Sequence, residues 1–352
     1  MLIPVEALRG AANRIIRAGG SSAAEAAIVA DHLIEANLRG HDSHGVGMLP
    51  TYIKNLQNRS LQPNEPGSIV KDEGAFLVYD GRRGYGQVVA RTATQLGIDK
   101  ARSSGSAVVA LRNAHHIGRI GSYGEQCAAA GLISLHFVNV MGHKALVAPH
   151  RGLDGRLSTD PVCIAIPEAE PGRPVILDMA TSKIAMGKVR VSRNKGEALA
   201  PEMIIDNRGD PSRDPAEMFT TPPGALLPMA EHKGYALAFV CQLLAGAVTG
   251  SGTVKPGNQG RDTITNGMLT FIIDPAQLGD GDWIRQEIRD FTAYATSSPV
   301  RNPAEPVLIP GDPERQRRAE RMREGIPVDA GSCAEIAEAA AILKVDLPEF
   351  GA

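Results

Sequence analysis

The first sixty residues show the periodicity of helices, with apolar positions recurring every three or four residues. Ser22 and Glu25 fit the S-x-x-E capping box that opens a helix, which we expect over residues 23–38. Gly40 ends that run, and another amphipathic run follows a few residues later. The segment between them, "HDSH" at residues 41–44, is therefore predicted to connect two helices.

From about residue 70 the pattern changes to short β-branched runs bounded by Gly, Pro and Asp, which predict strands. These runs are residues 75–80, 106–112, 132–140, 161–167, 174–179 and 268–275. Helical patterns lie between them, at residues 87–105 and 122–131. The stretch "GYALAFVCQLLAGAVTG" (residues 234–250) is apolar nearly all round and predicts a buried helix. After about residue 280 the helical pattern returns.

This order of elements predicts an α+β protein with a helical domain built from both ends of the chain. We assign residues 1–70 and 285–352 to the helical domain and residues 71–284 to an α/β domain that binds cofactor and substrate. No G-x-G-x-x-G motif follows any of the expected strands, which counts against a Rossmann dinucleotide fold.

The composition is that of an ordinary soluble protein, with 43% hydrophobic and 22% charged residues among 352. A net charge of −2 argues against binding to nucleic acid or to a membrane surface. We find neither an apolar run of about 20 residues, as a membrane span requires, nor a secretory signal peptide. The four cysteines are far apart and form no C-x-x-C motif. We therefore expect a cytoplasmic protein with reduced thiols.

The "HDSH" connection gathers His41, Asp42, Ser43 and His44 on one turn, and three interpretations stay open. The histidines and Asp42 can be metal ligands, although H-x-x-H on a loop is weak evidence without a further ligand. An imidazole beside a carboxylate and a hydroxyl can also transfer protons near neutral pH. The structural interpretation is that Asp42 and Ser43 cap the next helix.

The second histidine-rich segment, "RNAHHIGRIGSYGE" (residues 112–125), follows an expected strand and opens a helix. His115, His116 and the glycines would then lie beyond the carboxyl end of that strand, where α/β proteins commonly bind ligands. The N–H groups of the helix start favour an anion there. A purely structural role for the two histidines remains the alternative.

Two further segments combine small residues with polar ones. "LDMATSKIAMGKV" begins with the end of an expected strand at Asp178, and "EHKGYALA" places Lys233 and Gly234 at a helix start. A lysine at that position opposes the helix dipole, so we expect it to face an anion. Small residues allow a flat ligand to approach the backbone closely.

Taken together, six motifs between residues 40 and 312 resemble the type-2 malate/L-lactate dehydrogenase family. They are "GHDSHGVGMLPTY", "HHIGRIGSYGEQCA", "STDPVCIAIP", "LDMATSKIAMGK", "HKGYALA" and "LIPGD". The first two look most similar to the hydroxycarboxylate dehydrogenase branch of that family. The resemblance implies a non-Rossmann NAD(P)-binding fold, a homodimer and no metal. It also implies reversible hydride transfer between NAD or NADP and a 2-hydroxy or 2-oxo acid.

The resemblance also implies roles for particular residues. His44 matches the family's proton donor, with Asp42 or Ser43 as orienting neighbours, and His116 matches a histidine assigned as proton acceptor in some members. Segments that contact the cofactor in the family match Thr159, Asp160, Asp178, Met179, Ala180, Lys233, Gly234, Pro310 and Gly311. One imidazole with a pKa near 7 can serve both directions of the reaction.

The chain departs from the family pattern in its substrate-binding residues. Met48 stands where relatives often carry an arginine that clamps the substrate carboxylate. We expect Arg119, three residues after His116, to supply the guanidinium instead. Met48, near Tyr52, would then leave an apolar wall suited to a larger, aromatic side chain, so that phenylpyruvate-like acids outperform pyruvate. Asp160 also differs, because the usual "TNP" is "TDP" here.

Two other functions compete with the dehydrogenase. One is a metal-assisted hydrolase that uses His41, His44 and His116; the other is a binding protein on the same scaffold without catalysis. Neither the particular acid nor the choice between NAD and NADP follows from the sequence. Arg193 and Lys195 can meet a 2′-phosphate, but basic surface residues are common.

Overall fold

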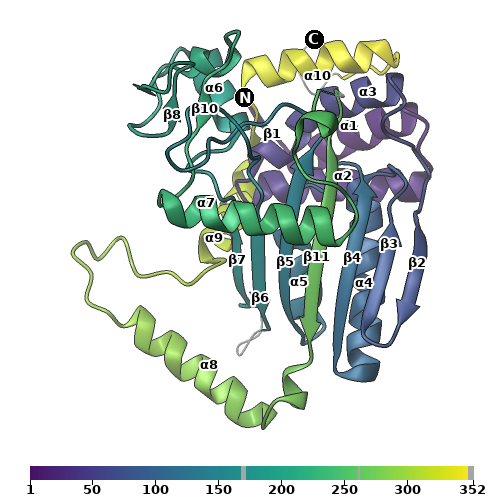
Figure 1. The fold of residues 1–352 in the computed structure, drawn as a ribbon, viewed down its shortest axis with the longest axis vertical. Coiled ribbons are helices and arrows are strands. Elements are labelled where there is room, and N and C mark those ends of the chain that lie inside the picture. Colours follow the sequence, from purple (N-terminus) through teal and green to yellow (C-terminus); the bar gives the residue numbers. More distant parts are fainter. Residues whose placement is uncertain (168–171, 261, 348–352) are drawn as a thin grey trace.

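The computed structural model describes residues 1–167, 172–260 and 262–347 and shows one large mixed sheet with helices on both faces (Figure 1). The predicted α+β class is confirmed. The helices are α1 (Val5–Ala18), α2 (Ala23–Leu38), α3 (Leu49–Gln57), α4 (Gly86–Ser104), α5 (Gly121–Ala129), α6 (Met186–Lys195), α7 (His232–Cys241), α8 (Gly281–Thr296), α9 (Asp312–Glu324) and α10 (Ala330–Ile342). The strands are β1 (Leu2–Ile3), β2 (Ser68–Glu73), β3 (Phe76–Asp80), β4 (Ser106–Ala114), β5 (Ile133–Met141), β6 (Val162–Ile166), β7 (Val175–Met179), β8 (Ile204–Ile205), β9 (Pro211–Ser212), β10 (Ala225–Leu226), β11 (Thr265–Ile273) and β12 (Ile326–Pro327).

The central sheet has seven strands in the order β2-β3-β4-β11-β5-β6-β7. Only β3 and β4 pair in parallel, with α4 as the crossover between them, and the other neighbours are antiparallel. Helices α4 and α5 pack on one face, and α7 with the π-helix η4 (Gln242–Val248) packs on the other. The buried strands β4 and β11 are rich in Val, Leu and Ile because both of their faces are covered.

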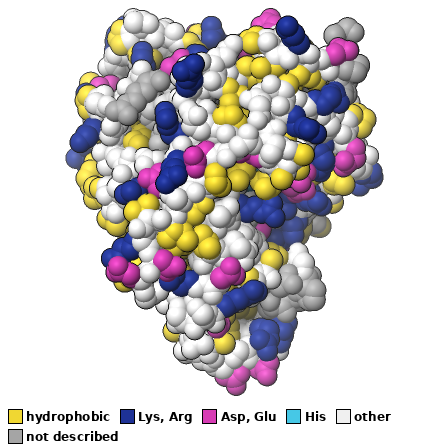
Figure 2. All heavy atoms as spheres, turned by 90° about the vertical axis from the view of Figure 1, so that its right-hand side faces the viewer, with side chains coloured by type: hydrophobic (Ala, Val, Ile, Leu, Met, Phe, Trp, Pro, Cys, Tyr) yellow, Lys and Arg dark blue, Asp and Glu magenta, His cyan; other side chains and the backbone are white. Residues whose placement is uncertain are grey.

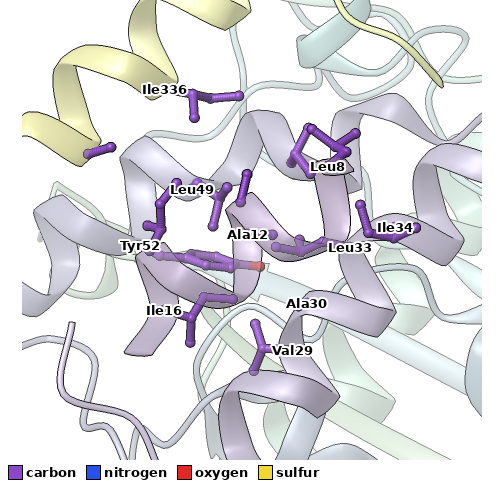
Figure 3. Packing of buried hydrophobic residues seen from close by; sticks show 14 of the residues in the cluster. Leu8, Ala12, Ile16, Val29, Ala30, Leu33, Ile34, Leu49, Tyr52 and Ile336 are labelled. Atoms are coloured by element: carbon purple, nitrogen blue, oxygen red, sulfur yellow. The ribbon is translucent and has the colours of Figure 1, made fainter. Parts of the chain in front are cut away.

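One hydrophobic core lies between the sheet and its helices. Another packs helices from the two ends of the chain against each other (Figure 3). It combines Leu8 of α1, Leu33 of α2, Leu49 and Tyr52 of α3, and Ile336 of α10. Strand β1 pairs with β12, so residue 2 lies opposite residue 327. The helices from both termini therefore close around one core.

Helix α8 stands apart from this cluster and contains no buried residue, although most of it falls within the predicted helical domain (Figure 1). The domain boundaries at residues 70 and 285 stay a prediction. A small three-stranded sheet, β10-β8-β9, lies beside α6 and was not expected from the sequence.

The stretch at residues 234–250 forms α7 and η4, but the prediction that it is buried was wrong on one side. Phe239, Val240, Leu243 and Val248 are 42–66% exposed. Ala238, Cys241 and Ala245 face the sheet and are fully buried. The helix therefore has apolar side chains on two faces. In a single chain the sheet covers one of these faces, and the other is exposed to solvent.

The surface mixes charges of both signs, as the net charge of −2 leads one to expect (Figure 2). Within the described residues, no helix combines the length and the apolar character that crossing a bilayer requires.

Candidate active site

The turn after α2 is braced by Asn37, a buried residue in the last turn of that helix. Its side-chain nitrogen donates to Asp42 Oδ1 (2.7 Å), and its oxygen accepts from the Val46 N–H (2.9 Å). A Cβ atom at Gly45 would lie 2.1 Å from the Asn37 oxygen, so only glycine allows this close contact. Asn37 thereby fixes the backbone on both sides of His44.

Asp42 points away from the imidazole that it was expected to orient. Its carboxylate pairs with Arg321 of α9, at 2.6 Å to Nη1 and 3.0 Å to Nη2. His41 is likewise occupied, with Nε2 3.5 Å from Glu314 Oε1. Ser43 packs against Gly187 of α6. The turn is therefore held from outside by α9 and α6, and His44 is directed inward.

His44 and His116 meet although 72 residues separate them in the chain. His44 Nδ1 lies 3.1 Å from His116 Nε2, and His116 Nδ1 lies 2.7 Å from the Tyr52 hydroxyl. Burial, reinforced by His41 and Arg119, lowers the pKa of His44 to about 4. Burial also places the pKa of His116 well below its usual range. Both imidazoles are therefore neutral near pH 7.

The neighbouring His115 faces another way, and its Nε2 lies 2.8 Å from Asn55 Oδ1. Of the two adjacent histidines, only His116 joins the site. Tyr52, expected to touch substrate, is only 1% exposed and contacts His116 instead.

A polar cleft of about 480 Å³ opens on one side of His44. Asp178, Met179 and Ala180, at the end of β7, form part of its wall together with Thr159. The cations that line it are Arg39, Arg119, Lys183, Lys188 and Arg317. Clustered cations and hydroxyls beside a strand end suit a phosphate-containing ligand.

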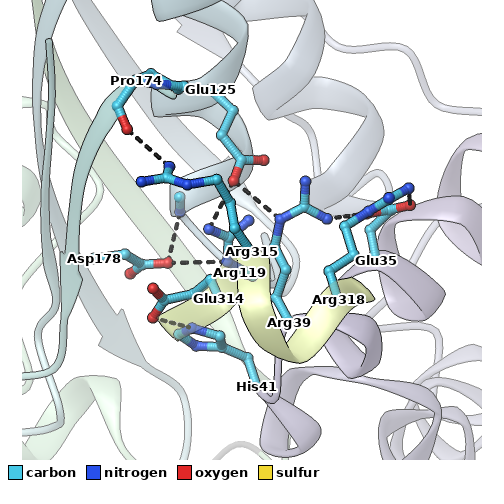
Figure 4. A network of polar contacts seen from close by, with 11 residues as sticks. Glu35, Arg39, His41, Arg119, Glu125, Pro174, Asp178, Glu314, Arg315 and Arg318 are labelled. Carbon is cyan, nitrogen blue, oxygen red and sulfur yellow. Dashed lines mark hydrogen bonds and ion pairs between the residues drawn. The ribbon is translucent and has the colours of Figure 1, made fainter. Parts of the chain in front are cut away.

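Arg119 lies in the wall of this cleft and is only 1% exposed (Figure 4). Its Nη2 is 3.0 Å from Glu125 and its Nε is 3.3 Å from Asp178. Burial alone would lower the pKa of Arg119, but the two carboxylates outweigh it and raise the pKa. Glu125 also pairs with Arg39, and Glu35 links Arg39 to Arg318. Arg119 therefore belongs to a buried ion-pair network that reaches from α5 to α9.

An apolar cavity of about 440 Å³ lies on the other side of His44. Its apolar wall consists of Met48, Val140, Leu146, Met186, Phe219 and Ile264. Two cations also line it, Lys144 and Arg190. The cleft and the cavity share Ser43, His44, Thr159 and Ala185, so the two spaces meet at the His44 imidazole.

Several residues that the motifs assigned to the cofactor do not line the cleft. Lys233 is exposed at the start of α7, while Gly234 is buried and packs against the carbonyl oxygens of Met229 and Thr181. Pro310 accepts a hydrogen bond from Ile176 of β7 (3.1 Å) and so lies behind the cleft, next to Gly311. The Asp160 side chain is fully buried and accepts from Gln242 Nε2 (2.7 Å).

Sequence reasoning missed some of the residues that shape the site. Asn37 carries no signal, because a polar residue near a helix end is common. Lys183 and Lys188 stand inside a quoted motif, but only its first residues were assigned to the cofactor. Of the two basic residues considered for a 2′-phosphate, Arg193 stacks on the Phe219 ring (4.2 Å) and Lys195 lines a separate pocket.

The residues present fit a nicotinamide dinucleotide. Arg119 Nη1 is buried and has no hydrogen-bond partner among the described residues, so the cleft wall retains an unused donor. Lys183, Lys188 and Arg39 would hold the phosphates, and Thr159 with Ala180 would face the ring near His44. Within the same described part of the chain, no three His, Cys, Asp or Glu side chains converge as metal ligands.

A half-buried imidazole between a cationic cleft and an apolar cavity suits a site where a small organic acid meets a phosphate-containing cofactor, on a fold without the Rossmann motif. Comparison with known proteins agrees: the model of the malate/L-lactate dehydrogenase family matches residues 3–337. The chain belongs to this family of nicotinamide-dependent hydroxy-acid dehydrogenases.

Relatives and solved structures support the assignment along the whole chain. The sequence is 46% identical to hydroxycarboxylate dehydrogenase B of Escherichia coli K12, over 95% of this chain and 92% of the relative. It is 39% identical to L-lactate dehydrogenase of Cupriavidus necator, over 91% and 92%. Sulfolactate dehydrogenase from Methanocaldococcus jannaschii superimposes with a TM-score of 0.85 at 29% identity, covering 100% of both chains.

Proposed function

We propose that this enzyme binds NAD or NADP in the polar cleft and a 2-oxo or 2-hydroxy acid in the apolar cavity, with His44 as the proton-transfer residue. The observation that carries the proposal is the shared position of His44, which lines both spaces. Hydride transfer requires the two reactants to approach each other at one point, with a proton donor or acceptor beside the reacting oxygen.

The nicotinamide, when bound, supplies or accepts the hydride. The protein itself orients the acid and transfers one proton. In the reduction of a 2-oxo acid, His44 first takes up a proton, and its imidazolium then donates that proton to the oxygen on C2 and becomes neutral. In the reverse direction it accepts that proton from the hydroxyl.

The cavity supports a substrate with a large side chain. Its wall contains Phe219, Ile264, Met186 and Met48, and a volume of about 440 Å³ exceeds what the methyl group of pyruvate needs. Met48 in place of the usual arginine removes a charge from this wall. Phenylpyruvate-like acids therefore fit better than pyruvate or oxaloacetate.

We further infer that two chains associate through the exposed apolar face of α7 and η4, because four large apolar side chains there, Phe239, Val240, Leu243 and Val248, are 42–66% exposed. The four cysteines are buried and unpaired, which is consistent with work in the reducing cytoplasm.

Steady-state assays with NADH or NADPH and a panel of 2-oxo acids test the proposal through the nicotinamide absorbance. We expect phenylpyruvate to give a higher kcat/KM than pyruvate. The His44→Ala variant should lower kcat by roughly 10²- to 10⁴-fold, the range for loss of a general acid. Retained turnover in His44→Ala, together with its loss in His116→Ala, would transfer the role to His116. No oxidation of either cofactor with any acid would refute the proposal.

A further inference from the structure

Three buried side chains and the half-buried His44 form an unbroken row of hydrogen bonds. Gln87 of α4 donates its Nε2–H to the Tyr52 hydroxyl at 2.6 Å. The Tyr52 hydroxyl lies 2.7 Å from His116 Nδ1, and His116 Nε2 lies 3.1 Å from His44 Nδ1. Gln87 and Tyr52 are 0% and 1% exposed, so this end of the row is shielded from solvent. Its members come from three separate parts of the chain.

With the Gln87 amide in this orientation, the donors in the row follow one order. Tyr52 has a single proton, and because its oxygen accepts from Gln87, that proton is donated to His116 Nδ1. A neutral His116 then carries its only N–H on Nε2, which donates to His44 Nδ1. A neutral His44 must carry its own N–H on Nε2, the nitrogen that makes no hydrogen bond within the described residues.

We propose that Gln87 and Tyr52 are positioning residues that determine which nitrogen of His44 carries the proton. The proposal rests on the function assigned to His44 above and extends it by two residues, neither of which lines the cleft or the apolar cavity. With Gln87 as the first donor, His44 presents Nε2–H to the junction of the two spaces. That arrangement hydrogen-bonds the carbonyl oxygen of a 2-oxo acid and polarises it.

The amide of Gln87 also permits the opposite order. Its Oε1 is buried and has no hydrogen-bond partner among the described residues. If the amide turns over, Tyr52 donates to Oε1, His116 donates Nδ1–H to Tyr52, and His44 donates Nδ1–H to His116. The number of protons in the row is unchanged, but His44 Nε2 now offers a lone pair. That form accepts the hydroxyl proton of a 2-hydroxy acid, which leaves His44 as imidazolium.

The surroundings keep the row neutral until a reactant binds. The groups that act electrostatically on the two imidazoles are His32, His41, His115, His143 and Arg119. They add to the effect of burial, which lowers the pKa of both His44 and His116. Burial also keeps Tyr52 in its protonated form by raising its pKa. The order of donors therefore depends on the amide at the far end of the row.

Tyr52→Phe tests the proposal with the loss of one hydroxyl and no change in shape. We expect kcat to fall by about 10- to 100-fold, as for other residues that orient a catalytic histidine. We also expect the acidic limb of the kcat–pH profile to move upward, because His116 loses the donor that opposes its protonation. Nitrogen-15 spectra of labelled histidine report the tautomer directly, without turnover, and should show His44 losing its preference for Nε2–H.

Gln87→Glu and Gln87→Met form a matched pair at the end of the row. A carboxylate can only accept from Tyr52, so Gln87→Glu should reverse the order of donors and raise the apparent pKa of the imidazole pair by about one unit or more. Gln87→Met leaves Tyr52 free to donate to His116, and the wild-type tautomer should persist. Gln87 also lines a separate pocket, in which Arg39, Arg91 and Arg318 lie together with Asp31, Glu35 and Glu125.

A purely structural role would lower the melting temperature of Tyr52→Phe while the pH profile and the histidine spectra stay as in the wild type. That result would overturn the proposal. It remains distinct from failure of the proposed function, in which the wild-type enzyme itself would show no turnover with any 2-oxo acid.

Discussion

Met48 and Arg190 lie in the wall of the same apolar cavity, which His44 also lines. Arg190 Nη2 is 3.5 Å from the position that a Cβ atom would take at Gly47. Its ion pair with Glu335 is long, at 3.5 Å, and partly exposed. A guanidinium next to Met48 can bind a carboxylate in nearly the place where relatives use an arginine at position 48. The structure thus favours Arg190 over Arg119, whose charge already faces Glu125 and Asp178.

We expect Arg190→Ala to raise KM for 2-oxo acids by about 10- to 100-fold with little change in KM for the cofactor. This corresponds to the loss of a charge-assisted hydrogen bond worth on the order of 1.5–3 kcal/mol. Initial rates at saturating cofactor provide the measurement. The methyl ester of the same acid serves as a control substrate, because without a carboxylate it should respond weakly to the substitution.

Two comparison variants decide between the candidate cations. Lys144 lines the same cavity, and Arg119 was the candidate from the sequence. A large rise in KM for Lys144→Ala or Arg119→Ala, with none for Arg190→Ala, would contradict the assignment. We expect Arg119→Ala chiefly to destabilise the fold, since it would leave Asp178 without this cation and Glu125 paired with Arg39 alone.

The sequence predicted the key histidines but not the directions of their neighbours. The resemblance offered His44 and His116 as proton-transfer residues, and the structure brings His44 Nδ1 within 3.1 Å of His116 Nε2. It could not show that Asp42 turns outward, because its partner Arg321 lies 279 residues away. Tyr52 likewise looked like a substrate contact, since spacing along a helix does not reveal which buried group a side chain meets.

Among the elements, the segment before β6 is tied to the helix on the sheet face by one buried carboxylate. Asp160 is 0% exposed, has a φ of +29°, and accepts hydrogen bonds from Gln242 and from the backbone of Ser158 and Val140. Burial raises its pKa from 3.8 to about 7, although these hydrogen bonds act in the opposite direction. Thr159, the preceding residue, lines both spaces beside His44.

The raised pKa predicts that stability depends on pH at this position. An acid with a higher pKa in the folded state stabilises the fold below its unfolded pKa, here 3.8. That contribution is lost as the pH rises through about 7. Asp160→Asn removes the titration, so its free energy of unfolding relative to the wild type should increase between pH 5 and pH 8. We expect an increase on the order of 2 kcal/mol.

Urea unfolding at the two pH values, at one protein concentration, measures this difference. Asp99→Asn, a change at an exposed aspartate of α4, provides the control and should show no comparable increase. An equal effect of Asp160→Asn at both pH values would show that Asp160 does not titrate in this range.

The helices and strands were predicted correctly where a long segment shows a single spacing of its apolar residues. The helix over residues 23–38 agrees with α2, and Ser22 caps it through the Glu25 N–H (3.2 Å). The short strands β8, β9 and β10 have two residues each, too few for a periodic pattern. The prediction that residues 234–250 are buried failed on one side of α7 and η4. An apolar sequence does not show whether a helix face is covered by its own chain or by another molecule.

At the scale of the whole molecule, exposed apolar side chains concentrate on α7 with η4 and on α8. Trp283, Phe291 and Tyr294 of α8 are 64–78% exposed, and this helix buries no residue against its own chain. An amphipathic helix without an intramolecular partner is poorly stabilised in water. A second copy of the chain that binds there would bury the apolar side chains of both surfaces.

We therefore expect the wild-type protein to sediment with about twice the mass of one chain. Leu243→Glu, at the exposed face of η4, should shift it toward the single chain, because burying an unpaired carboxylate in an apolar contact is unfavourable. Met322→Glu on α9 is the matched control, since Leu243 and Met322 are both 46% exposed. Sedimentation of Leu243→Glu as an undisturbed dimer would place the contact elsewhere.

The brace between Asp42 and Arg321 has a consequence for how the enzyme is made. The ribosome releases both histidines and most of the sheet before it releases α9, α10 and β12. Until then the turn after α2 lacks its outer support, and β1 lacks its pairing partner. A nascent chain can thus form its sheet early, as large proteins commonly fold in stages. The turn that carries His44 is held in place only when Arg321 has been synthesised, near the end of the chain. A product truncated before α9 would therefore be partly folded and yet inactive.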